Sequence, residues 1–464
     1  MAKRKKRVGE KPGDVVWSSS WTFILAASGA AIGLNNVWQF PVLVSEYGGG
    51  AFVVFYLLCV LLIGMPLLVA EVTIGRLGRK SPINSIHVVA EQAGRHRNWR
   101  LIGWLGVIAA FLILSYLSVV AGWIMAYAFR TMVGVLDGLT ADGLASLFRR
   151  FVNEPEKQLF WHSLFMVSTI MVAARGLKSG VEPLVRYAMP TVFLLLLALL
   201  LYAIVIGEFN QAVYRLLHPD FTKLTRAGML AALGHAFFSL GLGAGVLLAY
   251  AAYLQKEARI PRTALAVAGV DTVVGIVAGL VIMSVLLVGV AEPESRLALV
   301  FEALPLSFDQ LPWGRVMASL FFLMLALTVW LSGVALMEPV VMWMEERWHF
   351  TRLKAAIVTG GGAWSLGIAS VLSFNYWRFS FTVLGETKNL GPFDLLQTLT
   401  ADLLLPMSGM LIALTAGWIL GADSSRTELK LHSPCAYDSW LWCVRIVTPV
   451  LILIVLLNIQ SLLL

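Results

Sequence analysis

Residues 28–41 read Ser-Gly-Ala-Ala-Ile-Gly-Leu-Asn-Asn-Val-Trp-Gln-Phe-Pro, and this stretch decides the fold that we expect. It lies inside an apolar run long enough to cross a bilayer, which takes about 20 helical residues. Two glycines and two asparagines fall within residues 29–36. Gly costs about 1 kcal/mol relative to Ala in a helix, and Asn prefers to bond local backbone. Because loosened backbone survives at membrane depth only when it is buried in protein or lines a polar cavity, the stretch predicts a broken transmembrane helix that faces a site.

A second apolar segment carries a similar interruption. Residues 237–245 read Phe-Phe-Ser-Leu-Gly-Leu-Gly-Ala-Gly, with glycine at three alternate positions. Glycines also allow membrane helices to pack closely, and this is the alternative for either stretch alone. Two interrupted spans at matching places in two halves of a chain are instead typical of a binding site near the middle of the bilayer.

The composition indicates a membrane protein with many spans. The 464 residues are 59% hydrophobic and only 13% charged, which excludes a soluble domain of this length. The net charge of +8 reflects Lys and Arg clustered in alternate loops and does not indicate nucleic-acid binding. Three cysteines form no disulfide framework and no Cys-x-x-Cys motif. Residues 1–7 are basic without a following apolar core, so residues 1–16 are expected to be a cytoplasmic tail and not a signal peptide.

Apolar segments predict an all-α, polytopic fold. The loops rich in Lys and Arg place the N-terminus in the cytoplasm and the protein in the cell inner membrane. Ten spans divide into five and five, each half opening with an interrupted helix, which predicts an inverted repeat within a single transmembrane domain. Repeat one is expected at about 18–207, repeat two at about 228–420 and an extra helix at about 441–463. The eleven spans are expected at about residues 18–43, 50–74, 101–132, 158–175, 187–207, 228–254, 263–291, 314–344, 353–373, 392–420 and 441–463.

Asp271 is the ionisable residue within a span that we most expect to have a function, since such residues are costly in a bilayer. A cation site needs hard oxygen ligands. The chain offers such oxygens on Asp271, Asn36, Ser239 and the backbone carbonyl of Ala31. The alternative is a carboxylate at a water interface, because predicted span ends are uncertain. Glu71, deep in span two, is expected to be a hydrogen-bonded core group.

The chain resembles a known family, the neurotransmitter:sodium symporters, and is most similar to its bacterial, amino-acid-carrying members. The resemblance implies the LeuT-type fold with broken helices 1 and 6, and Na+-driven uptake. It covers nearly the whole chain in order. It rests on G-A-A-I-G-L-N-N-V-W-Q-F-P (29–41), E-Y-G-G-G-A-F (46–52), G-x-P-L-L-V-A-E-V-x-I-G-R (64–76), R-G-L-K-S-G-V-E (175–182), F-F-S-L-G-L-G (237–243) and M-E-P (337–339).

The resemblance implies two sodium sites. The second is weakened here because Leu331 stands where the family expects a hydroxyl or carboxylate, and losing one of about five ligands weakens or abolishes a hard-cation site. Asp271 stands where many relatives have Asn, as in chloride-independent members. The first site would use the Ala31 carbonyl, Asn36, Ser239 and Asp271, and the second the carbonyls of Gly29, Ile32 and Thr328 with the Ser332 hydroxyl.

Gly33 bears on the class of substrate. Monoamine carriers of the family have Asp there, whereas glycine leaves room for an amino acid's carboxylate near the amides of a half-helix N-terminus. The tyrosine that usually donates to this carboxylate aligns with Leu117, and Tyr116 is turned by about 100° from it, so an atypical substrate stays open. The implied substrate residues are Ala31, Gly33, Leu34, Asn35, Ile113, Tyr116, Leu117, Phe238, Ser239, Gly241, Ala244 and Ser332.

Three small residues bear on the size of the substrate. Gly241, Ala244 and Gly333 stand where relatives often carry bulkier or hydroxylated groups. An enlarged apolar cavity would favour a large hydrophobic side chain, because apolar burial contributes about 25 cal/mol per Å2. The alternative is that neighbouring side chains fill the space.

The gates depart from the family pattern. The extracellular Arg–Asp pair aligns with Gln39 and Gln397, and because both change together we expect a neutral hydrogen-bonding pair. On the cytoplasmic side the expected Arg aligns with Asp14, so the gate would be rebuilt with Arg7 or Lys11. The implied cytoplasmic gate residues that remain are Trp17, Tyr253 and Glu346.

Three hypotheses about function stay open from the sequence. The first is Na+-coupled symport of an amino acid, expected to be large and hydrophobic, by alternating access. The second is an H+-coupled or uncoupled carrier of an atypical substrate, and the third a transporter-like sensor without net flux. An enzyme is not expected, because no nucleophile–base pair or metal cluster stands in a loop. The expected partners are Na+, a small-molecule substrate and the lipid bilayer.

Overall fold

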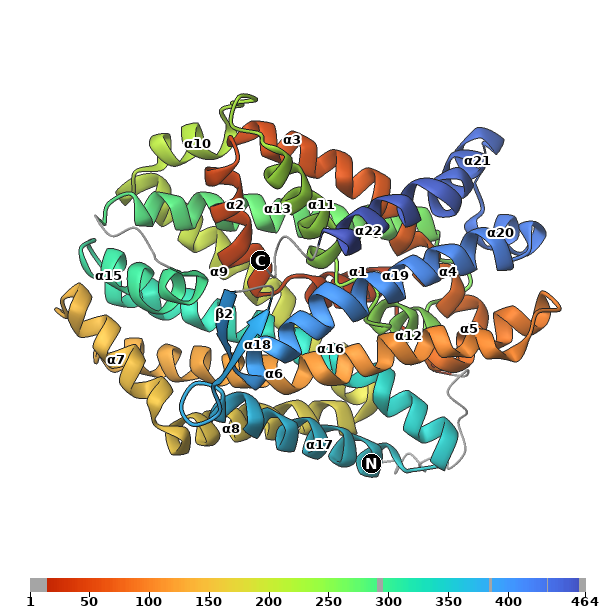
Figure 1. The fold of residues 1–464 in the computed structure, drawn as a ribbon, viewed down its shortest axis with the longest axis horizontal. Coiled ribbons are helices and arrows are strands. Elements are labelled where there is room, and N and C mark those ends of the chain that lie inside the picture. Colours follow the sequence, from red (N-terminus) through yellow and green to blue (C-terminus); the bar gives the residue numbers. More distant parts are fainter. Residues whose placement is uncertain (1–14, 290–294, 384–385, 432, 459–464) are drawn as a thin grey trace, which may run out of the picture.

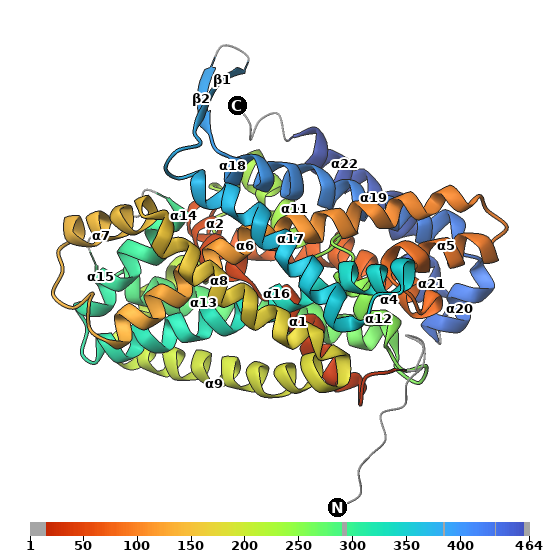
Figure 2. The same ribbon diagram turned by 90° about the horizontal axis from the view of Figure 1, so that it is seen from below.

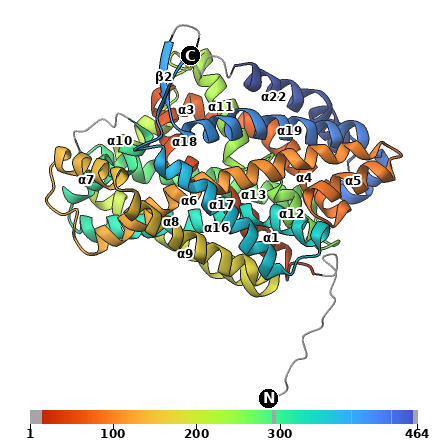
Figure 3. The same cartoon turned by 60° about the horizontal axis from the view of Figure 1, so that its bottom comes forward.

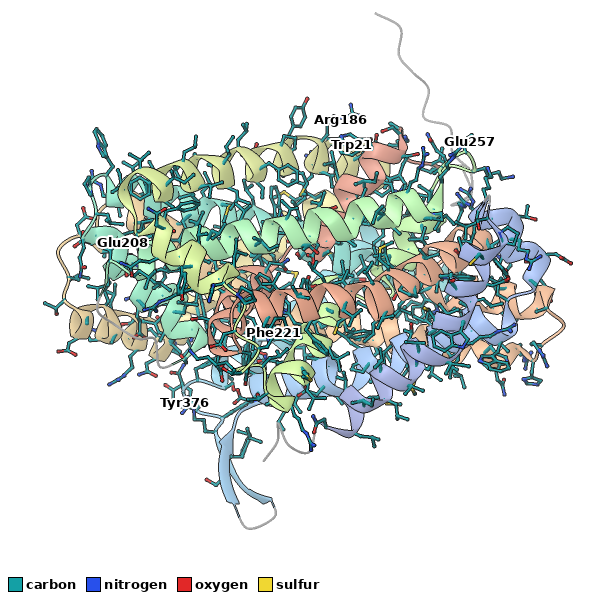
Figure 4. All side chains as sticks on the ribbon, turned by 90° about the horizontal axis from the view of Figure 1, so that it is seen from above. Trp21, Arg186, Glu208, Phe221, Glu257 and Tyr376 are labelled. Carbon is teal, nitrogen blue, oxygen red and sulfur yellow. The ribbon has the colours of Figure 1, made fainter. Side chains whose placement is uncertain are left out.

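The protein is a bundle of long helices (Figure 1), seen in a computed structural model that describes residues 15–289, 295–383, 386–431 and 433–458. Two charged residues, Glu208 and Glu257, lie at opposite ends of the bundle, whereas Trp21 and Arg186 project from its side (Figure 4). Within the described residues, eight helices are long and apolar enough to cross a membrane. They are Gly50–Gly78, Arg97–Met132, Leu177–Ile206, Ile260–Leu286, Gly314–Trp348, Arg352–Leu372, Pro392–Ile419 and Pro434–Leu457.

The remaining predicted spans are α8 and two broken helices, so the all-α polytopic prediction is confirmed. The first half of the chain contains α1 (Ser20–Ala31), η2 (Asn35–Gln39), α2 (Phe40–Glu46), α3 (Gly50–Cys59), η3 (Val60–Gly64), α4 (Met65–Gly78), α5 (Pro82–Gln92), η4 (Arg97–Arg100), α6 (Leu101–Met132), α7 (Ala141–Asn153), α8 (Pro155–Ala174), η5 (Leu177–Val181) and α9 (Glu182–Ile206).

The second half repeats the pattern of long helices with short ones between them. It contains α10 (Phe209–Leu217), α11 (Arg226–Ser239), α12 (Val246–Ala252), α13 (Ile260–Leu286), α14 (Arg296–Ala298), η6 (Leu299–Ala303), α15 (Leu304–Asp309), α16 (Gly314–Trp348), α17 (Arg352–Leu372), β1 (Phe379–Val383), β2 (Glu386–Leu390), α18 (Pro392–Gln397), η7 (Thr398–Leu404), α19 (Leu405–Leu414), η8 (Thr415–Ile419), α20 (Ala422–Leu429), α21 (Pro434–Trp442), η9 (Cys443–Val447) and α22 (Thr448–Leu457).

The first span is broken where the sequence predicts it. Helix α1 ends at Ala31, and Ile32 turns out of the helix with φ −64° and ψ 108°. The chain then continues through the π-helix η2 into α2. The break therefore separates the span at Ile32 and Gly33, the middle of the quoted stretch.

The second break depends on its glycines. Between α11 and α12 the residues Gly241, Gly243 and Gly245 have φ of +62°, +82° and +72°. These left-handed conformations cost a residue with a Cβ about 1–2 kcal/mol. A Cβ on Gly243 would also lie 2.4 Å from the carbonyl oxygen of Leu405, so this glycine is required by both conformation and packing.

The two broken spans run antiparallel to one another. Helix α1 contacts α12, while η2 and α2 contact α11. The first half of each broken span therefore lies beside the second half of the other, as an inverted repeat requires. Helix α16 contacts α1, α12 and α6, and α13 contacts α1, η2 and α2, so these helices surround both breaks.

Two features differ from the prediction. The fifth span was expected to begin near 187, but the helix starts at Leu177. Its first turns contain charged residues that pair with one another: Lys178 and Arg186 each lie 3.2 Å from the buried carboxylate of Glu182. The hairpin of β1 and β2 was not predicted. It pairs Phe379 with Leu390 and projects beyond the helices, on the side of the molecule opposite α9 (Figure 2).

We predict that Gly243→Ala destabilises the fold by on the order of 2–5 kcal/mol, because the left-handed backbone and the steric overlap add. Thermal unfolding of the purified protein in detergent measures this as a lowered Tm. Gly94→Ala is the matched control, since Gly94 has φ +66° but no atom within 4 Å of where a Cβ would stand. Equal melting shifts in both variants would contradict the packing argument.

Candidate functional site

Asn36 and Asp271 face one another beside the first break. Nδ2 of Asn36 donates to Oδ1 of Asp271 at 2.8 Å and to its backbone carbonyl at 3.4 Å. Both residues are at most 1% exposed. Oδ1 of Asn36 and Oδ2 of Asp271 are buried without a hydrogen-bond partner in the part of the chain that the structure describes. Two such oxygens, one on a carboxylate, fit a hard monovalent cation in their donor chemistry.

The other predicted ligands of this site lie nearby. The Ser239 hydroxyl interacts with the Asp271 carboxylate and lies 3.4 Å from the hydroxyl of Tyr56. The carbonyl of Ala31 is at the break itself, 3.8 Å from where a Cβ on Gly33 would stand. The structure thus brings Asn36, Ser239 and Asp271 together, while their role as sodium ligands stays a prediction.

A second cluster of oxygen atoms surrounds Ser332. Its hydroxyl lies 3.4 Å from the carbonyl of Gly29, 3.3 Å from that of Ile32 and 3.2 Å from that of Thr328. These are the four residues predicted for the second sodium site. A hydroxyl carries one proton, so it cannot satisfy all three carbonyls at once.

Apolar atoms close one side of this second cluster. A Cβ on Gly29 would lie 3.3 Å from Cδ1 of Leu331 and 3.0 Å from the sulfur of Met189. Leu331 is 3% exposed. The cluster offers four oxygen ligands, three carbonyls and one hydroxyl, and apolar atoms occupy the remaining side. Because a hard cation site of this kind takes about five ligands, the cluster fits a sodium ion only in part.

Gly33 and Gly241 have no tight neighbours, because a Cβ on either would make only ordinary van der Waals contacts. A Cβ on Gly33 would meet no atom closer than 3.8 Å, and one on Gly241 none closer than 3.9 Å. Ile113, Leu117 and Phe238 are half-buried although they belong to interior helices. Among the other predicted substrate residues, Leu34 and Ala244 are buried, and Asn35 accepts a hydrogen bond from Trp38.

Two residues expected near the substrate have other neighbours. The hydroxyl of Tyr116 lies 3.2 Å from that of Thr400, and its ring packs against Phe393, so Tyr116 faces the tenth span. Gly333 opens no space, because a Cβ there would lie 2.7 Å from the ring of Phe165. The expected enlargement at Gly333 is wrong, since a buried phenylalanine of α8 fills it.

The predicted outer gate is not bonded in this structure. Gln39 is half-buried and Gln397 is exposed. Among the described residues, the side chain of neither glutamine makes a hydrogen bond, so the expected neutral pair is absent from this conformation. The tenth span near Gln397 instead contacts α6 through the Tyr116–Thr400 pair.

The opposite end of the two breaks is closed by Trp17. Its indole donates to the carbonyl of Tyr250 at 2.9 Å, and its backbone amide donates to the carbonyl of Tyr253 at 3.0 Å. Gln255 donates to the Trp17 carbonyl at 2.9 Å. The start of the first span is thus bound to the end of α12. Arg7, Lys11 and Asp14, expected in this gate, lie outside the described residues.

Tyr253 and Glu346 belong to two separate networks. The Tyr253 hydroxyl donates to Glu338 at 2.8 Å, and Glu338 forms a two-point ion pair with Arg352. Glu346 instead accepts hydrogen bonds from the backbone and hydroxyl of Ser81, at 2.7 and 2.5 Å. Pairing of Tyr253 with Glu346 is therefore not observed.

Glu338 and Arg352 were not among the residues predicted from the sequence. Glu338 is fully buried, and Arg352 also donates to Glu345 at 3.1 Å and to the carbonyl of Ala173 at 2.8 Å. The network therefore joins α16, α17, α8 and the end of α12. A buried carboxylate in the quoted M-E-P motif was the available signal, since such a residue requires a partner.

The geometry defines a class of membrane protein: a polytopic helical carrier with two broken spans and a buried oxygen-rich site between them. The model of the sodium:neurotransmitter symporter family matches residues 15–140 and 154–462, and the chain belongs to this family.

The relatives agree along nearly their whole length. The chain is 34% identical to the sodium-dependent transporter YhdH of Bacillus subtilis, over 98% of this chain and 99% of YhdH. It is 29% identical to a sodium-dependent transporter of Haemophilus influenzae, over 95% of this chain and 97% of that protein. The crystal structure of MhsT in complex with L-phenylalanine superposes with a TM-score of 0.85 and 36% identity, covering 96% of this chain and 99% of MhsT.

We predict that Asp271→Ala abolishes Na+-dependent ligand binding and leaves a folded protein, because it removes the carboxylate that faces Asn36. Radioligand binding with and without Na+ measures this, and size-exclusion chromatography checks the fold. Asp142→Ala, at an exposed position of α7, is the control and should bind as the wild type. Unchanged Na+ dependence in Asp271→Ala would contradict the prediction that Asp271 is a sodium ligand.

We also predict that Na+ activates binding with a Hill slope near one, because Leu331 replaces a ligand of the second cluster. Leu331→Ser should restore an oxygen and raise the slope toward two. A wild-type slope near two that falls to one in Ser332→Ala would show that the second cluster already holds an ion.

Proposed function

We propose that this protein is a Na+-coupled symporter that carries an amino acid across the membrane by alternating access. The observation that carries the proposal is the pair of unpaired buried oxygens on Asn36 and Asp271, which lie at the first break. Membership of a sodium-dependent family supports Na+ as the coupled ion.

The bonding pattern around the breaks supports alternating access. Trp17 is bound to the end of α12, whereas Gln39 and Gln397 on the other side are unbonded within the described residues. A carrier with one side closed and the other without gate contacts has the asymmetry that alternating access requires. By the positive-inside rule, we expect the closed side to face the cytoplasm.

An amino acid is the substrate class that the site supports best. Gly33 carries no side chain and adjoins the amides that follow the first break, and a half-helix N-terminus favours an anion such as a carboxylate. The half-buried Ile113, Leu117 and Phe238 would meet the side chain, which favours a large apolar one. MhsT, a structural relative, was crystallised with L-phenylalanine, and this supports the same class.

The experiment that tests the proposal is uptake into proteoliposomes. A panel of radiolabelled amino acids is offered with an inward Na+ gradient, with K+ in place of Na+, and with a proton gradient. We expect accumulation of hydrophobic amino acids only with Na+. Accumulation driven by protons, or binding without accumulation, would contradict Na+-coupled symport.

The substrate-size prediction follows from the apolar walls. We expect Leu, Met, Phe and Trp to compete for binding better than Gly or Ala, since each buries more apolar area. Ile113→Trp should selectively weaken the largest competitors by narrowing the space. Ile108→Trp, on the same helix at a position that is 42% exposed, is the matched control. A preference for Gly or Ala would reject a large apolar substrate.

A further inference from the structure

A row of aromatic rings joins the ends of three helices. Trp104 of α6 packs edge-on against Trp343 of α16, with ring centroids 4.6 Å apart, and Trp343 packs in the same way on Trp348 at 4.9 Å. Trp348 continues the row to Phe350, at 5.5 Å, in the turn before α17. These ends lie at the same end of the bundle as α5 (Figure 3).

One end of the row packs against buried side chains, and the other end is exposed on the surface. Trp104 and Trp343 pack on a small apolar cluster of Ile83, Val107 and Val340, whereas Trp348 is 48% exposed. Next to the row, exposed apolar side chains continue along α6 and α17. They are Leu101 (60% exposed), Leu353 (57%) and Ile357 (52%). Tryptophan rings at the ends of membrane-spanning helices, beside exposed apolar groups, are typical of the membrane interface.

Three cations border the row without an acidic partner. Arg100 lies one turn before Trp104, Arg347 adjoins Trp348, and the ammonium of Lys354 stands 4.1 Å from the centre of the Phe350 ring. All three are exposed, and none forms an ion pair within the residues that the structure describes.

The nearby carboxylates are already engaged. Glu345 accepts from Arg352 at 3.1 Å, and Glu346 accepts from Ser81 and Asn84 at 2.5 Å each. Within the described residues, neither carboxylate forms an ion pair with Arg100, Arg347 or Lys354. An aromatic belt alone would accept any phospholipid, but three exposed cations without an ion-pair partner add attraction for a negative headgroup.

We propose that the α6–α16 patch, made of Trp104, Trp343, Trp348, Phe350, Arg100, Arg347 and Lys354, binds an anionic phospholipid. The acyl chains lie along the exposed apolar residues of α6 and α17, and the phosphate-bearing headgroup lies among the cations. The positive-inside rule assigns this end to the cytoplasmic leaflet. A lipid bound here bridges α6, α16 and α17, and so stabilises their relative positions.

Native mass spectrometry of the full-length protein in detergent tests this proposal. The protein is titrated with phosphatidylglycerol and with phosphatidylcholine of the same acyl chains. Each Lys or Arg near a membrane surface strengthens anionic binding roughly fivefold, so we expect at least about a tenfold preference for phosphatidylglycerol. The combined variant Arg100→Gln/Arg347→Gln/Lys354→Gln should lose this preference.

The matched control removes three exposed cations from the other end of the bundle, with Arg149→Gln, Arg150→Gln and Arg215→Gln on α7 and α10. It should keep the wild-type preference, and both variants should melt like the wild type because the changed residues are exposed. Equal loss in both variants would mean that only net charge matters, and would overturn the site. A dimer lost in the first variant with unchanged lipid preference would assign the patch to a second copy and overturn the lipid proposal.

Discussion

The hydrogen bond from Asn36 to Asp271 links the first break to span seven, and the rest of the site depends on it. This bond orients both side chains, so that one oxygen atom of each is left over in the interior. An uncompensated buried carboxylate is costly, by several kcal/mol. A cation between these oxygens removes that cost. Binding of the ion would therefore stabilise the local structure, and the gain in stability would increase with the affinity for the ion.

The loosened backbone around this pair is held by the remaining helices. The carboxylate of Glu71 accepts the amide of Gly243 at 2.7 Å, which confirms its predicted role as a hydrogen-bonded core group. Ser332 takes a similar part at the first break, where its hydroxyl lies within 3.4 Å of three carbonyls. At the position predicted for the second sodium ion, between α1 and α16, the structure has the Ser332 hydroxyl and the apolar side chains of Leu331 and Met189.

The two breaks and the Asn36–Asp271 pair could be predicted because glycine, asparagine and an intramembrane carboxylate leave a local signal. Contacts between distant helices leave none. Gly333 was expected to enlarge the substrate cavity, but Phe165 of α8 fills the space beside it. The sequence does not show this contact, because it depends on how α8 packs against α16. Tyr116 differs from Leu117 by one position, and only the structure places its hydroxyl beside Thr400. Glu346 was predicted to belong to the closed gate with Tyr253, but the Tyr253 hydroxyl bonds to Glu338. The sequence does not distinguish these two carboxylates, which lie about two turns apart on α16.

The most direct test of the account is a pair of experimental structures of the protein with bound substrate, one prepared in Na+ and one in K+. The account predicts an ion coordinated by Oδ1 of Asn36 and Oδ2 of Asp271 in Na+, and its absence in K+. It also predicts no second ion beside Ser332 in either structure. A water that donates to both oxygens, or a protonated Asp271 that donates from Oδ2 to Oδ1 of Asn36, in both structures would contradict it.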